Sequence, residues 1–177
     1  MARIIYKKGC EGQNRLECIE GIEIELLNGQ KALIYPRYAK RVLLGNEKIK
    51  SYEQEPDTEI SALKKTDNLG ATGRLDACGS PAVEFVAQFR SDKHGIFALP
   101  TLLAAMEIQD QKKDIDALAE TIEGADLLRN FTYDVWTCSR YNDILGWIAV
   151  GSFGFADKCY LRASALVVPT ILYREII

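Results

Sequence analysis

Residues 22–35 read IEIELLNGQKALIY and carry the clearest structural signal in the chain. Apolar and charged side chains alternate from Ile22 onward, which is the period of a strand with one buried face. The dipeptide Asn28-Gly29 follows, and this pair strongly favours a tight hairpin turn. Residues 31–35 then continue as the partner strand and end before a proline. The stretch therefore predicts an antiparallel β-hairpin.

Elements of both kinds surround the hairpin. Helices are expected to begin near Pro56-Asp57-Thr58 and where Ser80 and Thr101 can act as N-terminal caps. The third helix runs to about residue 122, with an interruption at 111–113. Further strands are expected at residues 4–6, 41–44, 133–139, 147–150, 165–168 and 171–173. Because strands are followed by helices and then by strands again, the sequence predicts an α+β fold rather than a wound parallel sheet.

Two parts of the chain are candidates for a chemical site, and neither fits one. Residues 70–74 read GATGR and lack the third glycine of a dinucleotide fingerprint and the Gly-Lys-Ser/Thr ending of a phosphate loop. A flexible connection is the expected structure there. Four acidic residues fall within the long helical region, and their pattern indicates a solvated helical face rather than an acid–base pair. They are Glu107, Asp110, Asp114 and Asp116.

Composition excludes several classes of protein. The 177 residues are 47% hydrophobic and 27% charged, which is typical of an ordinary globular chain. The formal net charge of -3 gives no global attraction for nucleic acid, so nucleic-acid binding is unlikely. Residues 31–50 are locally basic, and a solvated surface is favoured there over a nucleic-acid patch. No apolar run reaches the roughly 18 residues that cross a bilayer. The N-terminus lacks a secretory pattern, so a cytoplasmic location is expected.

The cysteines predict free thiols rather than disulfides or a metal site. Their number, five, is odd, and they form no CxxC motif. Cys10 and Cys18 do not have zinc-finger spacing. His94 is the only histidine and is expected in a loop. The sequence thus implies neither a metal nor any other cofactor.

The strongest polar constellation lies between two tryptophans. Trp136 and Trp147 flank a loop whose residues are Arg140, Tyr141, Asn142 and Asp143. One interpretation is that the tryptophans only fill the core behind adjacent strands. In the other interpretation, the tryptophans support the loop and the loop binds a ligand. The guanidinium of the arginine would donate hydrogen bonds, and the ring of the tyrosine would stack on the ligand. These four residues are the candidate ligand-binding site.

Several short motifs resemble bacterial C-type-lectin-like domains found in collagen-like adhesins and phage receptor-binding proteins. They are Leu99-Pro100-Thr101 before a helix, the strand WTCSRY at 136–141, Trp147, and an apolar final strand. The similarity covers about residues 95–173. Two features depart from the family pattern: Ile96-Phe97-Ala98 replaces a Trp-Arg pair, and no arginine immediately precedes Val167.

The resemblance implies a twisted antiparallel sheet flanked by helices, with the chain ends close together. Residues 1–94 would form an N-terminal hairpin-containing and helical part of the same single domain, 1–177. It also implies a non-catalytic binding or structural protein with a protein or glycan ligand, in the cytoplasm or in a virion. Calcium is not implied, because the Glu-Pro-Asn loop of animal lectins is absent. The alternative is an enzyme related to the sulfatase-modifying proteins of this fold, which would use Cys138 or Cys159.

Overall fold

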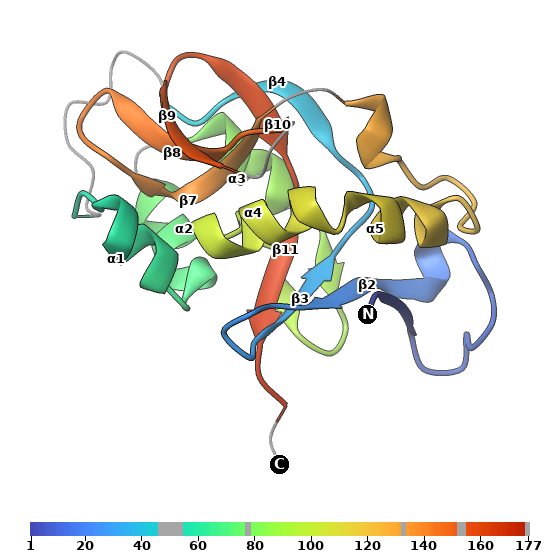
Figure 1. Ribbon diagram of the computed structural model, residues 1–177. Coiled ribbons are helices and arrows are strands. Elements are labelled where there is room, and N and C mark those ends of the chain that lie inside the picture. Colours follow the sequence, from blue (N-terminus) through green and yellow to red (C-terminus); the bar gives the residue numbers. More distant parts are fainter. Residues whose placement is uncertain (46–54, 77–78, 132–133, 152–154, 176–177) are drawn as a thin grey trace.

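The computed structural model of the chain describes residues 1–45, 55–76, 79–131, 134–151 and 155–175 (Figure 1). Its α-helices are α1 (Glu59–Lys64), α2 (Asn68–Asp76), α3 (Pro81–Val86), α4 (Leu102–Asp110) and α5 (Lys112–Ala119). Two 3-10 helices, η1 (Leu16–Cys18) and η2 (Leu128–Asn130), lie in connections. The strands are β1 (Arg3–Tyr6), β2 (Ile19–Glu25), β3 (Lys31–Ile34), β4 (Ala39–Leu43), β5 (Arg90–Ser91), β6 (Gly95–Ile96), β7 (Val135–Arg140), β8 (Leu145–Ala149), β9 (Ala156–Tyr160), β10 (Ser164–Val167) and β11 (Thr170–Tyr173). The predicted α+β class is confirmed.

The predicted hairpin forms the centre of a four-stranded antiparallel sheet with the order β1-β2-β3-β11. The N–H of Leu26 donates to the carbonyl of Gln30 at 2.9 Å across the turn. Gly29 sits there with φ +80°, a conformation that costs glycine little. The alternating isoleucines Ile22 and Ile24 are fully buried in the core shared with α4 and α5. The period-2 pattern thus identified this apolar face correctly, but the prediction of a half-buried strand is wrong, because the opposite face with Glu23 is buried as well.

The second sheet is five-stranded and mixed, with the order β4-β10-β7-β8-β9. Strand β10 runs parallel to β7, and its other neighbour β4 is antiparallel. Trp136 is fully buried within this sheet's core, as the core interpretation expects. Figure 1 shows α4 and α5 crossing the middle of the molecule between the strands of the two sheets.

Pro169 lies where the chain passes from one sheet to the other. The sequence predicts that a strand containing this proline is bulged or at an edge. Instead, β10 ends at Val167 and β11 begins at Thr170 in the other sheet, so the proline lies in the two-residue connection. Its carbonyl accepts the N–H of Tyr35 at 3.1 Å. This crossover physically links the two sheets.

The predicted caps at Ser80 and Thr101 are confirmed, and the helix predicted to begin near residues 56–58 is capped by Thr58. The hydroxyls of Thr58, Ser80 and Thr101 accept N–H groups three residues on, at 3.2 to 3.3 Å. The predicted interruption of the long helix is also present, because α4 ends and α5 begins on either side of Gln111. Helix α3 stops at Val86, earlier than the predicted end near Ser91-Asp92.

Three further expectations are wrong. Residues 70–74 form part of helix α2 rather than a flexible connection, because Ala71 and Leu75 are buried against the second sheet's core. Strand β9 was not expected at all. Glu107 and Asp116 do not lie on a solvated face. Both are buried, and their carboxylates accept backbone N–H groups, Glu107 from Leu27 and Asp116 from residues 128 and 129.

The two ends of the described chain come together at the four-stranded sheet. Arg3 and Glu175 form an ion pair at 3.5 Å, although β2 and β3 separate their strands. The resemblance implied such proximity of the ends. Within the described residues, no helix combines the length and apolar character needed to span a membrane.

Candidate functional site

The predicted site begins with a turn that is held by its own side chain. The carboxamide oxygen of Asn142 accepts the N–H groups of Ile144 at 2.9 Å and Leu145 at 2.8 Å. The N–H of Tyr141 donates to the carbonyl of Leu145 at 2.8 Å. This is an Asx-type turn, and it joins β7 to β8. The carboxamide oxygen of Asn142 is therefore used to shape the loop.

The sequence predicted Arg140 in the loop, but this residue is the last one of strand β7. Only 7% of its side chain is exposed, and one guanidinium nitrogen lies 3.2 Å from the carboxylate of Asp143. Its backbone carbonyl accepts the N–H of Asp57 at 2.8 Å. The guanidinium therefore faces the protein, while the carboxylate of Asp143 is largely exposed. The structure brings these two predicted residues together as an ion pair.

Tyr141 lies at the surface and rests on the second tryptophan. Its ring meets that of Trp147 edge-on, with centroids 5.6 Å apart and planes at 86°. The indole N–H of Trp147 donates to the carbonyl of Asp57 at 2.8 Å, which fixes the buried ring. The ammonium of Lys158, from β9, lies 4.3 Å from the Tyr141 centroid and 5.6 Å from that of Trp147. This cation–π arrangement orients both side chains.

Two large exposed side chains lie next to this group. Tyr160 on β9 is 63% exposed and pairs with Leu145 of β8 in the ladder. Ile144 is 58% exposed, and its carbonyl accepts the N–H of Leu161 at 2.8 Å, just beyond β9. Both therefore lie at the same end of the sheet as Tyr141. We call Tyr141, Ile144, Lys158 and Tyr160 the Tyr160 face.

Sequence reasoning missed three members of the Tyr160 face. Residues 156–160 read ADKCY, and none of the five is buried, so no apolar alternation marks the strand. One signal was present: Lys158 and Tyr160 have the spacing of neighbours on one face of a strand. The ladder pairs them with Trp147 and Leu145, the same face of β8.

The cysteines named for the enzymatic alternative do not form a pair. Cys138 lies on β7 and Cys159 on β9, with β8 between them, which puts them about 10 Å apart at ordinary strand spacing. Burial raises the pKa of Cys138 to about 12. The pKa of Cys159 is also raised, first by burial and then by the charge of Asp134. Since the thiolate is the nucleophile, these surroundings do not favour cysteine catalysis.

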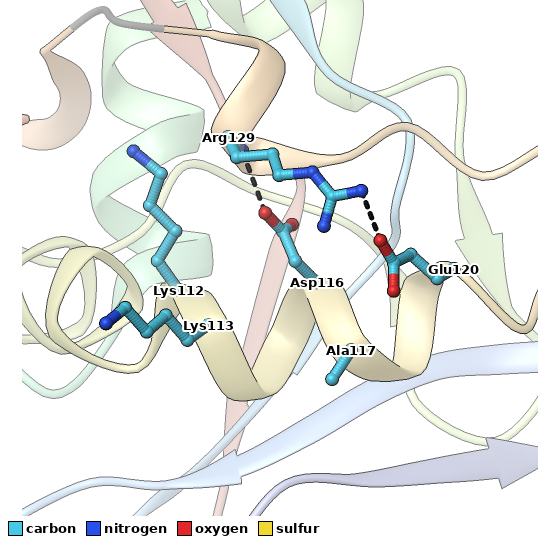
Figure 2. A pocket seen from close by; sticks show the side chains of 6 residues that line it. All are labelled: Lys112, Lys113, Asp116, Ala117, Glu120 and Arg129. Carbon is cyan, nitrogen blue, oxygen red and sulfur yellow. Dashed lines mark hydrogen bonds and ion pairs between the residues drawn. The ribbon is translucent and has the colours of Figure 1, made fainter.

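A hollow of about 400 Å³ runs along α5 (Figure 2). Its carboxylates already have partners in the chain. Asp116 accepts the N–H groups of Leu128 and Arg129, and Glu120 pairs with the Arg129 guanidinium. Figure 2 shows Lys112 and Lys113 extending away from these carboxylates. The hollow is therefore best explained by the docking of η2 on α5.

His94 lies in the β5–β6 turn, as expected, and stacks on Tyr173 with ring centroids 4.1 Å apart. The Tyr173 hydroxyl donates to the buried carboxylate of Glu23, which also binds Arg3 at 2.7 Å and Lys31 at 3.4 Å. Burial first, and then the charge of Lys93, lower the pKa of His94. Among the residues that the structure describes, no group of acidic, cysteine or histidine side chains could hold a metal ion.

The basic stretch 31–50 does not form one surface. Lys31 pairs with Glu23 beneath the four-stranded sheet, Arg37 lies 3.6 Å from Asp126, and Lys40 lies over the ring of Phe131. Lys48 and Lys50 lie outside the described residues. The described part of the stretch is thus divided among separate contacts, which does not favour a nucleic-acid patch.

Comparisons with known proteins found no match for this chain. No family model matches it, and neither a curated protein nor a solved structure matches it significantly.

Proposed function

We propose that this chain is a non-catalytic binding protein that presents the Tyr160 face to an acidic, apolar segment of a partner protein. The observation that carries the proposal is the Lys158 ammonium, held over the rings of Tyr141 and Trp147 beside two large exposed apolar side chains. Aromatic side chains with little rotamer freedom are the usual anchors of protein interfaces.

The polar groups of the loop support a protein ligand over a glycan. A glycan site needs several convergent hydrogen-bonding side chains around a stacking ring. Here the Asn142 carboxamide oxygen holds the turn, and the Arg140 guanidinium is buried against Asp143. The side chains that remain exposed are mainly apolar: Tyr141, Ile144 and Tyr160. Their contribution to binding would come from buried apolar area and ring packing.

Charge complementarity supports an acidic segment. Lys158 forms no ion pair with any carboxylate of the described residues, and its ammonium contacts only ring faces. A partner carboxylate placed next to this ammonium would complete a charge-assisted hydrogen bond. Exclusion of water by the surrounding rings would strengthen that bond.

We also propose that the scaffold is C-type-lectin-like. Three features support this: helix α4 begins after Leu99-Pro100-Thr101, the strand containing Trp136 pairs with the strand containing Trp147, and the chain ends meet at one sheet. Such scaffolds hold variable loops on a rigid sheet, which suits binding sites. Fold alone does not define function, so the binding proposal depends on the Tyr160 face.

A random linear peptide display library, selected on the purified full-length protein, tests the function. We expect enriched sequences that combine Asp or Glu with aliphatic or aromatic residues. A selected peptide should lose roughly tenfold or more in affinity for Lys158→Glu and for Tyr160→Ser, since both changes remove an anchor of the interface.

Leu27→Ser is the matched control, because Leu27 is also highly exposed but lies at the β2–β3 turn. It should bind the peptide like the wild type. Enriched peptides that lack acidic residues, or that bind Lys158→Glu as tightly as the wild type, would overturn the proposal. Glycan-array binding that disappears in Tyr160→Ser would replace the protein ligand with a sugar.

A further inference from the structure

The connection between β1 and β2 folds two cysteines toward each other. The N–H of Lys7 donates to the carbonyl of Cys18 at 3.0 Å, continuing the β1–β2 ladder. The N–H of Cys10 donates to the carbonyl of Lys7 at 3.1 Å, which closes a tight turn. A turn of this kind keeps its first and fourth Cα atoms within about 7 Å. Cys10 is thereby folded back toward the backbone of Cys18.

Gln13 also connects the pair, through its backbone N–H and its side chain. The N–H of Gln13 donates to the carbonyl of Cys10 at 3.0 Å, and the thiol of Cys18 donates to the Gln13 side-chain oxygen at 3.5 Å. The pKa of Cys10 is raised, first by its hydrogen bond with Cys18. The pKa of Arg15 is raised, first by its hydrogen bond with the same cysteine. The Cys18 thiol therefore influences the pKa of both Cys10 and Arg15.

We propose that Cys10 and Cys18 are a thiol-modification site that forms a reversible disulfide with each other by exchange with low-molecular-weight disulfides such as oxidised glutathione. Disulfides need Cα atoms about 4.4–6.8 Å apart, a range that this folded loop can reach with little movement. The two residues also differ in accessibility. Cys10 is partly exposed, whereas Cys18 is only 5% exposed.

The difference in exposure sets the order of the steps. The raised pKa of Cys10 slows this exchange at neutral pH, and partial exposure gives the thiol access to the disulfide. The Cys10 thiolate attacks oxidised glutathione, forms a mixed disulfide and releases one glutathione thiolate. The Cys18 thiolate then attacks the Cys10 sulfur, forms the internal disulfide and releases the second glutathione. The two protons lost by the cysteines are taken up by the released glutathiones, so two thiols are oxidised and one disulfide is reduced. The neighbouring Arg15 stabilises the negative charge on sulfur during the second step.

The other described cysteines lack this arrangement. Cys138 is fully buried, and Cys159 lies two strands away from it. The 7–18 loop, in contrast, contacts the end of α5. Asn14 accepts the N–H of Glu123 at 2.9 Å, and its side chain donates to Thr121 at 3.0 Å. The internal disulfide would therefore clamp the loop that covers this helix end.

The test incubates the reduced, folded full chain with oxidised glutathione, alkylates free thiols and maps the products by mass spectrometry. We expect the wild type to lose two hydrogens and to yield a Cys10–Cys18 cross-linked peptide. Cys18→Ser should instead retain one glutathione on Cys10, because the resolving thiol is missing. Cys159→Ser is the control and should give the wild-type cross-link.

The same measurement identifies failure. A wild type that keeps glutathione on Cys10 without forming the cross-link would overturn the proposal. Cross-links between either cysteine and another position would also overturn it. Circular dichroism of each variant before oxidation shows that the fold is intact, and incubation with reduced glutathione should restore the two thiols.

Discussion

Strands β9 and β11 are both edge strands that end on a tyrosine, but the two tyrosines have opposite surroundings. Tyr173 on β11 stacks on His94, and its hydroxyl donates to the buried Glu23. Tyr160 on β9 is 63% exposed, and the neighbouring lysine contacts other rings. One sheet thus engages the hydroxyl of its edge tyrosine in an internal contact, whereas the other leaves its edge tyrosine exposed, as the proposed binding role requires.

The two sheets also differ in how far their edge regions are covered by other parts of the chain. The outer face of the four-stranded sheet is covered by the β5–β6 hairpin, because the N–H of Asp92 donates to the buried carboxylate of Glu20 at 2.9 Å. In the five-stranded sheet, Trp136 and Trp147 are buried in separate hydrophobic clusters, and β9 contributes no buried residue. The comparison predicts large stability effects at the tryptophans and the covered sheet, and small ones on β9.

The largest effect should come from Trp136→Ala. This side chain is fully buried, and its indole N–H donates to the carbonyl of Val42 at 2.7 Å. Truncation of a buried tryptophan costs about 3–5 kcal/mol, since it leaves a cavity and an unpaired carbonyl. Urea unfolding measures the loss. A midpoint equal to that of the wild type would show that the second sheet does not depend on this core.

Two glycines, one in each sheet, allow the tolerance of the two sheets to an added methyl group to be compared. Gly21 has φ +155°, and an added Cβ would lie 2.6 Å from the backbone oxygen of Ile34. At Gly146 the nearest atom is a methyl carbon of Leu44 at 2.7 Å, which can move. We expect Gly21→Ala to cost about 3 kcal/mol and Gly146→Ala about 1–2 kcal/mol in the free energy of unfolding. The reverse order would mean that the first sheet adapts more easily than its backbone contact suggests.

The buried Glu23 network should make the stability of the first sheet depend on pH. Burial alone would raise the pKa of Glu23, but hydrogen bonds from Tyr173 and Arg3 and the charge of Lys31 outweigh it and lower the pKa. Because the folded pKa lies below the unfolded one, the stabilisation is present at neutral pH. It is lost as the pH falls below about 4, through the folded pKa.

Glu23→Gln should therefore cost about 2 kcal/mol at pH 7, and its difference from the wild type should shrink in acid. Chemical denaturation at a series of pH values measures both. Asp114→Asn, at an exposed position of α5, is the control for the change in charge and should show little effect at any pH. A difference at position 23 that is constant down to pH 3 would contradict the assigned network.

Local patterns predicted the hairpin, the caps of two helices, the break at Gln111 and the burial of Trp136. Each depends on neighbouring residues or on strong apolar periodicity. Helix α2 was missed because its glycines disfavour a helix, while tertiary contacts stabilise it. The carboxamide of Asn68 donates to the carbonyls of Leu99 and Thr170, which lie far along the chain. Such contacts have no local signal in sequence.

In the candidate site, too, some positions could be predicted from local sequence and others depend on tertiary contacts. Tyr141 and Asp143 were predicted at the surface and lie there. The burial of Arg140 was not foreseen, because it depends on the packing of the segment around Asp57 over the end of β7. Lys158 and Tyr160 come from a strand without alternation, and only the ladder with β8 places them beside Tyr141. The polar loop was recognisable, but the surface that it forms with β9 was not.

Two matched substitutions, Tyr160→Ser and Tyr173→Ser, test whether β9 is a binding edge and β11 a structural one. Each variant is measured for unfolding in urea and for binding to a library-selected acidic peptide. We expect the free energy of unfolding of Tyr160→Ser to stay within about 0.5 kcal/mol of the wild type, while its affinity for the peptide falls roughly tenfold or more. Tyr173→Ser should lose about 2–3 kcal/mol, because its ring stacking and its hydrogen bond to Glu23 are removed, and should bind normally while folded. Unchanged peptide binding by Tyr160→Ser, together with a large loss of stability, would contradict the assignment of β9 as the binding edge.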